Sequence, residues 1–251
     1  MPAMVAFDLD DTLAPSKTRL PDRVAQVLGQ VLTRASVCVI SGGQFGQFRS
    51  QVVDALDAAG VTGLENLHLM PACGTQYYRW RDGRWTRVYL EALSEDEKTR
   101  AVTAVEDCAR ELGLWEEHTW GPPLEDRESQ ITFSALGQHA PVEAKKAWDP
   151  TGEKKLRLRA AVARRLPDLE VRAGGSTSVD ITRVGRDKSF GMTRLMELTG
   201  LSCQDVLFFG DRLDEHGNDY PVKAMGVPCV AVTGWQDTAE RLEEMLTGDQ
   251  S

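Results

Sequence analysis

Three carboxylates stand within four positions of the segment AFDLDDTLAPSK, directly after a short apolar run. Like charges this close repel one another, so Asp8, Asp10 and Asp11 either form a solvated turn, with Thr12 beginning a cap, or face a cation and a substrate. Side chains two apart in an extended segment point the same way, so Asp8 and Asp10 project together where the first predicted strand ends. Mg²⁺ prefers such oxygen ligands. The segment alone leaves both interpretations open.

Other predicted elements also present polar groups where they begin or end. Ser41 ends the apolar run SVCVI and is followed by Gly42 and Gly43, and a hydroxyl with bare backbone amides suits a phosphate oxygen. Lys188 begins a predicted helix and brings a cation close to the sheet. Each feature also has an ordinary explanation, as a turn residue or as a solvated helix start.

A further acidic group follows the apolar run VLFFG. Asp211 ends that run, and Asn218 with Asp219 comes shortly after it. The carboxyl ends of the strands are where an open α/β sheet binds its ligands. Taken in order along the chain, these strand-end features favour one shared site over a set of unrelated turns.

The elements that must position these residues alternate between strand and helix. Continuous apolar runs of this kind are typical of strands that are buried on both faces of a parallel sheet. The first predicted strand begins at residue 4, and three others span 36–43, 205–212 and 227–234. The predicted helices span 21–35 and 188–200. This alternation predicts a doubly wound parallel α/β sheet with right-handed crossovers.

The middle of the chain has a different pattern. Aromatic runs on both sides of an Asp-Gly pair predict a hairpin over 76–90. Amphipathic helices are predicted over 94–114 and 152–168, a strand over 129–136, and two short strands thereafter. We therefore expect an inserted α+β domain over residues 87–186, between core segments 1–86 and 187–251.

Composition excludes several classes of protein. The 251 residues carry a net charge of −9, which argues against a nucleic-acid or anionic-membrane surface. Long apolar runs are missing and the first residues do not resemble a secretion signal, so we expect a cytoplasmic protein without membrane contact. Five widely spaced cysteines without a C-x-x-C pair indicate reduced thiols and neither a disulfide framework nor a zinc site.

The ordered set of strand-end residues resembles the haloacid dehalogenase (HAD) superfamily over nearly the whole chain. The motifs of that superfamily are matched, in order, by DLDDT from Asp8, by Ser41, by Lys188, and by Asp211 with Asn218 and Asp219. The insert resembles the subclass IIB cap. Within that subclass the segments GGSTSVDITRVGRDKS and FFGDRLDEHGND are most similar to the eukaryotic-type α-phosphomannomutases.

This resemblance implies a role for each residue of the core. Asp8 is implied to be the nucleophile that forms an aspartyl-phosphate, and Asp10 the general acid and base. The implied Mg²⁺ ligands are Asp8, the main-chain carbonyl of Asp10, and Asp211. Ser41, Gly42, Gly43 and Lys188 are expected to hold the phosphate oxygens. Behind them, Thr12 supports the loop, while Asn218 and Asp219 orient metal-bound water or Lys188.

The cap is expected to select the substrate. Ser178 and Asp180 are two residues apart on a predicted strand, so they share a face, and they match the sugar-binding serine and aspartate of the mutases. Arg127 matches an arginine of that family and is expected to bind a distal phosphate or a sugar oxygen. Gln138 and Lys145 stand where the mutases have arginine, which weakens the clamp that a mutase needs for a bisphosphate intermediate.

Two further departures lie in the core. Ser41 supplies the hydroxyl of HAD phosphatases where the mutases have glycine, and Asp11 replaces the glycine that usually precedes the threonine. The sequence therefore predicts a Mg²⁺-dependent phosphatase of hexose phosphates or related small metabolites. One alternative is a phosphomannomutase, and another is a non-enzymatic phosphoacceptor similar to a receiver module. Because the mutases dimerise through their caps, a homodimer is also expected.

Overall fold

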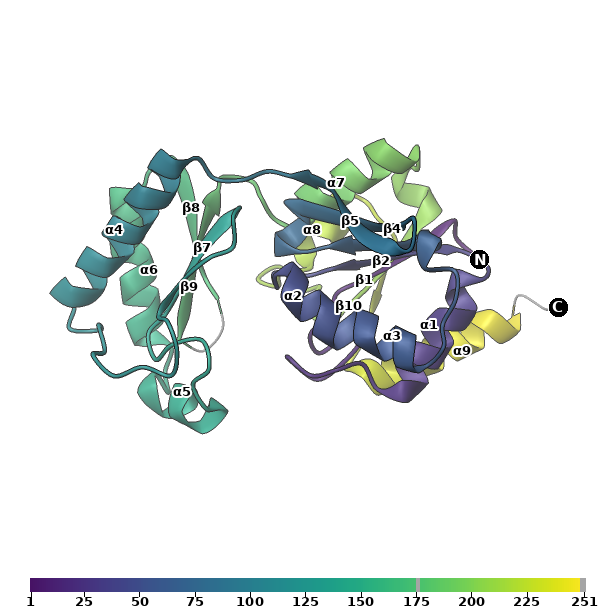
Figure 1. The fold of residues 1–251 in the computed structure, drawn as a ribbon, viewed down its shortest axis with the longest axis horizontal. Helices are drawn as coiled ribbons and strands as arrows, with labels where there is room; N and C mark the ends of the chain where they lie inside the picture. The colour runs from purple at the N-terminus through teal and green to yellow at the C-terminus, as the bar shows by residue number, and fades with distance from the viewer. Residues whose placement is uncertain (175–176, 249–251) are drawn as a thin grey trace. The chain divides into compact units, whose positions relative to one another are not determined.

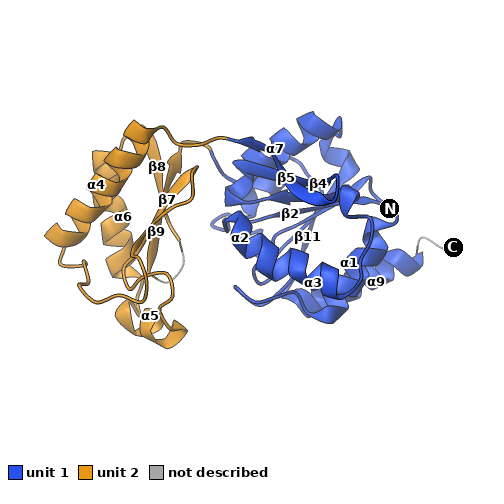
Figure 2. Cartoon of the chain, in the orientation of Figure 1, with its two compact units in different colours: residues 1–90, 186–251 blue, residues 91–185 orange. Residues whose placement is uncertain are grey.

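The computed structural model describes residues 1–174 and 177–248. The chain divides into two compact units, Met1–Leu90 with Arg186–Ser251 and Glu91–Gly185 (Figure 2). The first boundary lies a few residues beyond the expected position 87, because the hairpin that ends at Leu90 pairs with the sheet of the first unit.

The first unit is built on a seven-stranded sheet whose first five strands are parallel. Their β-branched and apolar side chains are mostly buried, as expected for strands covered on both faces, and the exceptions lie mainly on the edge strand Cys229–Ala231. In sheet order the strands are β11 (Cys229–Ala231), β10 (Val206–Gly210), β1 (Met4–Phe7), β2 (Ser36–Ile40), β3 (Leu67–Met70), β4 (Gln76–Arg81) and β5 (Arg84–Leu90). The predicted parallel α/β core is confirmed, and the antiparallel hairpin β4–β5 extends its edge.

Helices cover both faces of this sheet (Figure 1). They are α1 (Asp22–Leu32), α2 (Phe45–Phe48), α3 (Asp54–Ala58), α7 (Lys188–Thr199), α8 (Tyr220–Ala224) and α9 (Trp235–Gly248). Along β1, Val5 and Phe7 pack in the core beneath α1, α3 and α9, whereas Met4 and Ala6 pack in the core beneath α7 and α8. The alternation follows from the two-residue period of a strand.

A π-helix over Arg49–Val53 joins α2 to α3 into one helical segment. No helix is predicted for this segment from the sequence. Short 3₁₀ turns lie at Leu64–Asn66, Ala72–Gly74 and Cys203–Asp205. Within the described residues no helix has the length and apolar composition needed to cross a bilayer. All five cysteines lie among the described residues, and they are free thiols.

The second unit contains a four-stranded antiparallel sheet with two long helices on one face. Its elements are α4 (Glu95–Glu111), β6 (Leu124–Asp126), β7 (Gln130–Ser134), α5 (Val142–Trp148), α6 (Glu153–Arg165), β8 (Leu169–Ala173) and β9 (Ser178–Arg183), and the strand order is β6-β7-β9-β8. Phe133 and Ile181 belong to the core shared with α4 and α6. Neighbouring positions carry polar side chains, so the opposite face of the sheet is polar.

Candidate active site

Asp8 directly follows the central strand β1 and is buried, with 3% of its surface exposed. Its backbone amide donates to the carbonyl of Phe209 on the neighbouring strand at 3.0 Å, so the parallel ladder fixes its position at the carboxyl end of the sheet. Lys188 is the first residue of α7 and is 1% exposed. Asp187 caps this helix by accepting from the amide of Ser189 at 2.9 Å.

Lys188 links two buried carboxylates. Its Nζ donates to Asp8, and it donates to Oδ1 of Asp219 at 2.5 Å. Burial disfavours the ammonium ion, but Asp8 and Asp219 together outweigh burial and raise the pKa of Lys188 above its ordinary value. Burial, with a smaller contribution from Asp219, raises the pKa of Asp8 although Lys188 opposes that shift. This cluster therefore carries more negative charge than its single lysine balances.

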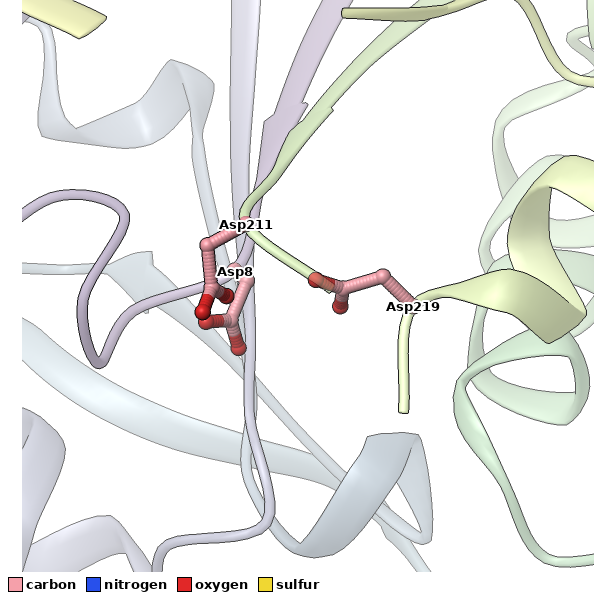
Figure 3. Close-up of side chains that lie close together, drawn as sticks. All are labelled: Asp8, Asp211 and Asp219. Atoms are coloured by element: carbon pink, nitrogen blue, oxygen red, sulfur yellow. The ribbon is translucent and has the colours of Figure 1, made fainter. Parts of the chain in front are cut away.

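A third carboxylate completes the cluster. One oxygen each of Asp8, Asp211 and Asp219 lies within 4.8 Å of the others, and Figure 3 shows their side chains converging. Burial and the charge of Asp219 raise the pKa of Asp211. Three carboxylates against one ammonium leave two negative charges, and oxygen-only ligands suit a hard cation. The residues present fit a divalent ion such as Mg²⁺.

This set adds Asp219 to the predicted carboxylate ligands Asp8 and Asp211, and the main-chain carbonyl of Asp10 stays a predicted ligand. Asp219, which was expected to orient Lys188 or water, contacts Lys188 and also lies among the converging oxygens. The carboxylate of Asp10 is directed elsewhere, because its Oδ1 accepts from the backbone amide of Lys17 at 2.7 Å. Two glutamine amides, from Gln47 and Gln51, also point at this carboxylate.

Asp11 and Thr12 have separate structural roles. Asp11 has a φ of 62°, a left-handed conformation that glycine adopts more readily, which fits the glycine that the resemblance predicts at this position. Its Oδ1 accepts from the amide of Ser16 at 3.2 Å. The Asp11 side chain is exposed, and its hydrogen bond to Ser16 stabilises the loop. Thr12 is fully buried, and its hydroxyl donates to Asp211 at 3.4 Å. Thr238 donates to the Thr12 carbonyl at 2.8 Å, which holds the loop against α9.

The glycine-rich turn after β2 lies beside the 3₁₀ turn that follows β3. Ser41 is 5% exposed, and its carbonyl accepts from Cys73 at 2.9 Å. The carbonyl of Gly43 accepts from Ala72, also at 2.9 Å, and its amide donates to the Ser41 hydroxyl at 3.5 Å. The intervening Gly42 is half-buried. These contacts fix the turn with the Ser41 hydroxyl at the carboxyl end of the sheet.

The remaining core residue of the prediction is Asn218. It is exposed on the loop between β10 and α8, next to the fully buried Asp219. The structure thus brings Asp8, Lys188, Asp211 and Asp219 into contact at the carboxyl end of the sheet, whereas Asn218 faces solvent. Its role in orienting water stays a prediction.

In the second unit, the polar face of the sheet carries the predicted substrate residues. Asp180 on β9 accepts from the Thr132 hydroxyl on β7 at 2.8 Å, and the hydroxyls of Ser178 and Ser134 lie 2.9 Å apart. Nε and Nη2 of Arg127 both donate to Oε2 of Glu125, at 2.9 and 2.7 Å. Burial raises the pKa of Asp180. Backbone pairing therefore places these side chains on one face.

Gln138 and Lys145 lie at the end of this unit that contains α5. The ammonium of Lys145 donates to the Gln138 carbonyl at 3.3 Å. The Gln138 side-chain nitrogen is buried without a hydrogen-bond partner among the described residues. The two residues at the arginine positions of the mutases are thus neighbours.

Sequence reasoning missed the two glutamines at Asp10 and the partner of Asp180. Gln47 and Gln51 lie four residues apart in a segment for which no element was predicted. Nothing in the sequence therefore indicates that their side chains point towards the loop of Asp10. Thr132 could have been predicted to lie on the polar face, because alternation in SQITFS places it on the same face as Gln130 and Ser134.

The fold and the site together define the class of the protein. A parallel α/β sheet that gathers Asp8, Lys188 and Asp211 at its carboxyl end, with an insert preceding the lysine, is the architecture of the HAD superfamily of phosphoryl-transfer enzymes. Solved structures support this fold. A haloacid dehalogenase-like hydrolase from Bacteroides thetaiotaomicron has a TM-score of 0.67 at 16% identity, covering 98% of this chain and 100% of that one. A C-terminally truncated Plasmodium falciparum IMP-nucleotidase has a TM-score of 0.72 at 14% identity, covering 98% and 71%.

The chain belongs to the eukaryotic phosphomannomutase family, whose family model matches residues 24–248. It is 24% identical to the phosphomannomutase of Saccharomyces cerevisiae over 226 residues, which covers 87% of this chain and 84% of that protein. It is 24% identical to the phosphomannomutase of Encephalitozoon cuniculi over 246 residues, covering 96% and 92%. The resemblance predicted from the sequence motifs is confirmed.

Proposed function

We propose that this HAD-family enzyme transfers phosphoryl groups of hexose phosphates through an aspartyl-phosphate on Asp8, as a phosphomannomutase. The observation that carries the phosphoryl-transfer step is the buried contact of Asp8 with Lys188, next to Asp211 and Asp219. Phosphoryl transfer depends mainly on positioning and on balancing the charge of the phosphate oxygens. A buried carboxylate nucleophile beside a buried ammonium ion supplies both.

The chemical step uses the two aspartates of the first loop. A carboxylate oxygen of Asp8 attacks phosphorus, and the bond from phosphorus to the sugar oxygen breaks. The electron pair of that bond stays on the sugar oxygen, which takes the proton of the Asp10 carboxyl group. In the second step a sugar hydroxyl attacks phosphorus and forms the new phosphate ester, the bond from phosphorus to Asp8 breaks, and Asp10 accepts the proton of that hydroxyl.

Asp8, Asp211 and Asp219 are the residues that would hold Mg²⁺, and the main-chain carbonyl of Asp10 is a further candidate. When bound, the ion supplies positive charge that balances the phosphate oxygens. Lys188 and the Ser41 hydroxyl are assigned to the remaining oxygens, and the amides of Gly42 and Gly43 widen this anion site.

The second unit is assigned to sugar recognition. Ser178 and Asp180 present a hydroxyl and a carboxylate on one polar face, and Arg127 lies in the turn between β6 and β7. Hydroxyl and carboxylate groups suit sugar hydroxyls, while the guanidinium group suits a phosphate. Relatives across the family are named phosphomannomutase, which supports the isomerase over the phosphatase that the sequence alone favoured. Membership of an enzyme family also argues against the receiver-like alternative.

A phosphatase is the second candidate, because of Gln138 and Lys145. A mutase must retain a bisphosphate intermediate while it turns over, and an amide with a single ammonium ion grips a phosphate less firmly than two guanidinium groups. The contact between Lys145 and Gln138 supports the proposal that both residues weaken the same part of the clamp. Formation of a homodimer through the second unit remains a prediction.

One assay separates the two candidates. The enzyme is incubated with mannose 1-phosphate, Mg²⁺ and a trace of hexose 1,6-bisphosphate, and mannose 6-phosphate and inorganic phosphate are both measured. Accumulation of mannose 6-phosphate without phosphate release is expected for the mutase. Release of inorganic phosphate in step with substrate loss would contradict the mutase and support the phosphatase. Asp8→Asn serves as the control, and neither product should form with it.

A further inference from the structure

Three donors surround the carboxylate of Asp10. The backbone amide of Lys17 donates to Oδ1 at 2.7 Å, and Nε2 of Gln51 points at the same oxygen from 3.5 Å. Nε2 of Gln47 approaches the other oxygen, Oδ2, at 3.4 Å. The two side-chain contacts are long, as is common for catalytic hydrogen bonds before substrate binds. All three donors serve the residue assigned to proton transfer.

Gln51 is the best anchored of these donors. It is 3% exposed, and its Nε2 also donates to the carbonyl of Thr18 at 2.6 Å. Its backbone carbonyl accepts from the amide of Leu20 at 2.9 Å. The side chain and the backbone of Gln51 therefore both hold the loop that carries Asp10.

The amide orientation of Gln51 is fixed by these neighbours. Thr18 and Asp10 both present acceptors to Nε2, so rotation of the amide would set oxygen against oxygen. The other amide atom, Oε1, is buried and has no hydrogen-bond partner among the described residues. Leaving a buried acceptor unsatisfied is unfavourable. The amide orientation that leaves Oε1 unpaired is therefore set by the contacts of Nε2 with Thr18 and Asp10.

The backbone around Gln51 is also unusual. Gln51 is the middle residue of the π-helix Arg49–Val53 that joins α2 to α3. Single-turn π-helices are rare and occur frequently at functional sites, because the extra residue changes the direction of the side chains that follow. This π-turn lies on the one segment that reaches the loop of Asp10 with two glutamines.

We propose that Gln51 is a positioning residue that orients the Asp10 carboxyl group for proton transfer to the leaving sugar oxygen. This inference rests on the proposed function. A residue with this task affects only those reactions whose leaving group needs a proton. A sugar alkoxide needs one, whereas 4-nitrophenolate is a much weaker base and departs without it.

The test compares two phosphate esters with the variant Gln51→Met, which has nearly the same shape but no amide. In the presence of Mg²⁺ and without bisphosphate, kcat/KM is measured with mannose 6-phosphate from the slow transfer of its phosphoryl group to water, followed as phosphate release. With 4-nitrophenyl phosphate it is measured from nitrophenolate release. This constant reports the steps up to departure of the leaving group. Since general acid catalysis typically contributes about 10²–10⁴-fold, the loss with the sugar ester is expected to exceed the loss with the aryl ester about tenfold or more.

Three further variants control the comparison. Gln26→Met, at an exposed glutamine of α1, should change neither constant. If Gln51→Met fails to fold, Gln51→Asn retains a polar group, is too short for both contacts, and should show the same preference. Asp10→Asn should show the largest difference between the two esters.

The outcomes separate the inference from the proposed function. Equal losses of kcat/KM for both esters in the Gln51 variants, with the difference present in Asp10→Asn, would overturn the role of Gln51 alone. Equal losses in Asp10→Asn would overturn the proton-transfer role of Asp10, and the inference with it. A difference in both sets of variants supports both assignments.

Discussion

Replacing Lys188 by methionine removes the one positive charge that contacts two buried carboxylates. Asp8 and Asp219 are 3% and 0% exposed, so neither gains water when the ammonium ion is lost. Removing one partner of a buried ion pair destabilises a protein by about 3–5 kcal/mol, because the charge that remains is buried and uncompensated. With two carboxylates left unpaired, we expect a loss near the upper limit, about 5 kcal/mol in metal-free buffer at pH 8.

The loss should depend on pH with a definite sign. Burial already raises the pKa of Asp8 above its ordinary value of 3.8, and removal of Lys188 removes the interaction that opposes this shift. The folded state then binds more protons than the unfolded state at pH values above 3.8, so stability falls as pH rises through that range. Lys188→Met should therefore be closer to wild type at pH 5.5 than at pH 8.

Urea unfolding followed by circular dichroism, in EDTA at both pH values, measures this difference. Lys223→Met, at an exposed lysine of α8, is the matched control and should unfold like wild type. The double variant Lys188→Met/Asp219→Asn should regain part of the lost stability at pH 8, since one of the uncompensated charges is gone. A loss below about 1 kcal/mol, or one of equal size at both pH values, would refute the assignment of a buried ion triad.

The remaining predictions concern catalysis, metal binding and the second unit. Asp8→Asn should lower phosphate-ester turnover by about 10³-fold or more, since a nucleophile is removed; turnover near the wild-type rate would exclude the aspartyl-phosphate. Mg²⁺ at about 100 times its Kd should stabilise wild type by about 2.7 kcal/mol and Asp211→Asn by much less, measured by thermal unfolding. An equal gain in both would place the ion elsewhere. The Arg183 guanidinium lowers the pKa of Glu97 from 4.5 to about 2, so this carboxylate stabilises the fold above pH 4.5 and the contribution is lost as pH falls towards 2. Glu97→Gln should therefore be less stable than wild type at pH 7 in urea unfolding and nearly equal to it near pH 2; a difference that persists at pH 2 would count against the ion pair.

The sequence by itself determined which residues meet at the carboxyl end of the sheet. Apolar runs predict buried parallel strands, and the carboxyl ends of parallel strands lie on one edge, so Asp8, Ser41 and Asp211 had to come together there. The position of Lys188 near that edge followed from its place at the start of a predicted helix. These inferences need only local patterns and one rule of α/β topology.

Only the tertiary structure decided how the side chains divide the work. Asp219 joins Asp8 and Asp211 because the loop after β10 folds back, with the backbone amide of Arg212 donating to Asp219 at 3.1 Å. Asp10 turns towards Gln51, a residue 41 positions away. Rotamers and loop conformations of this kind depend on contacts between distant segments, and no periodicity in the sequence encodes them.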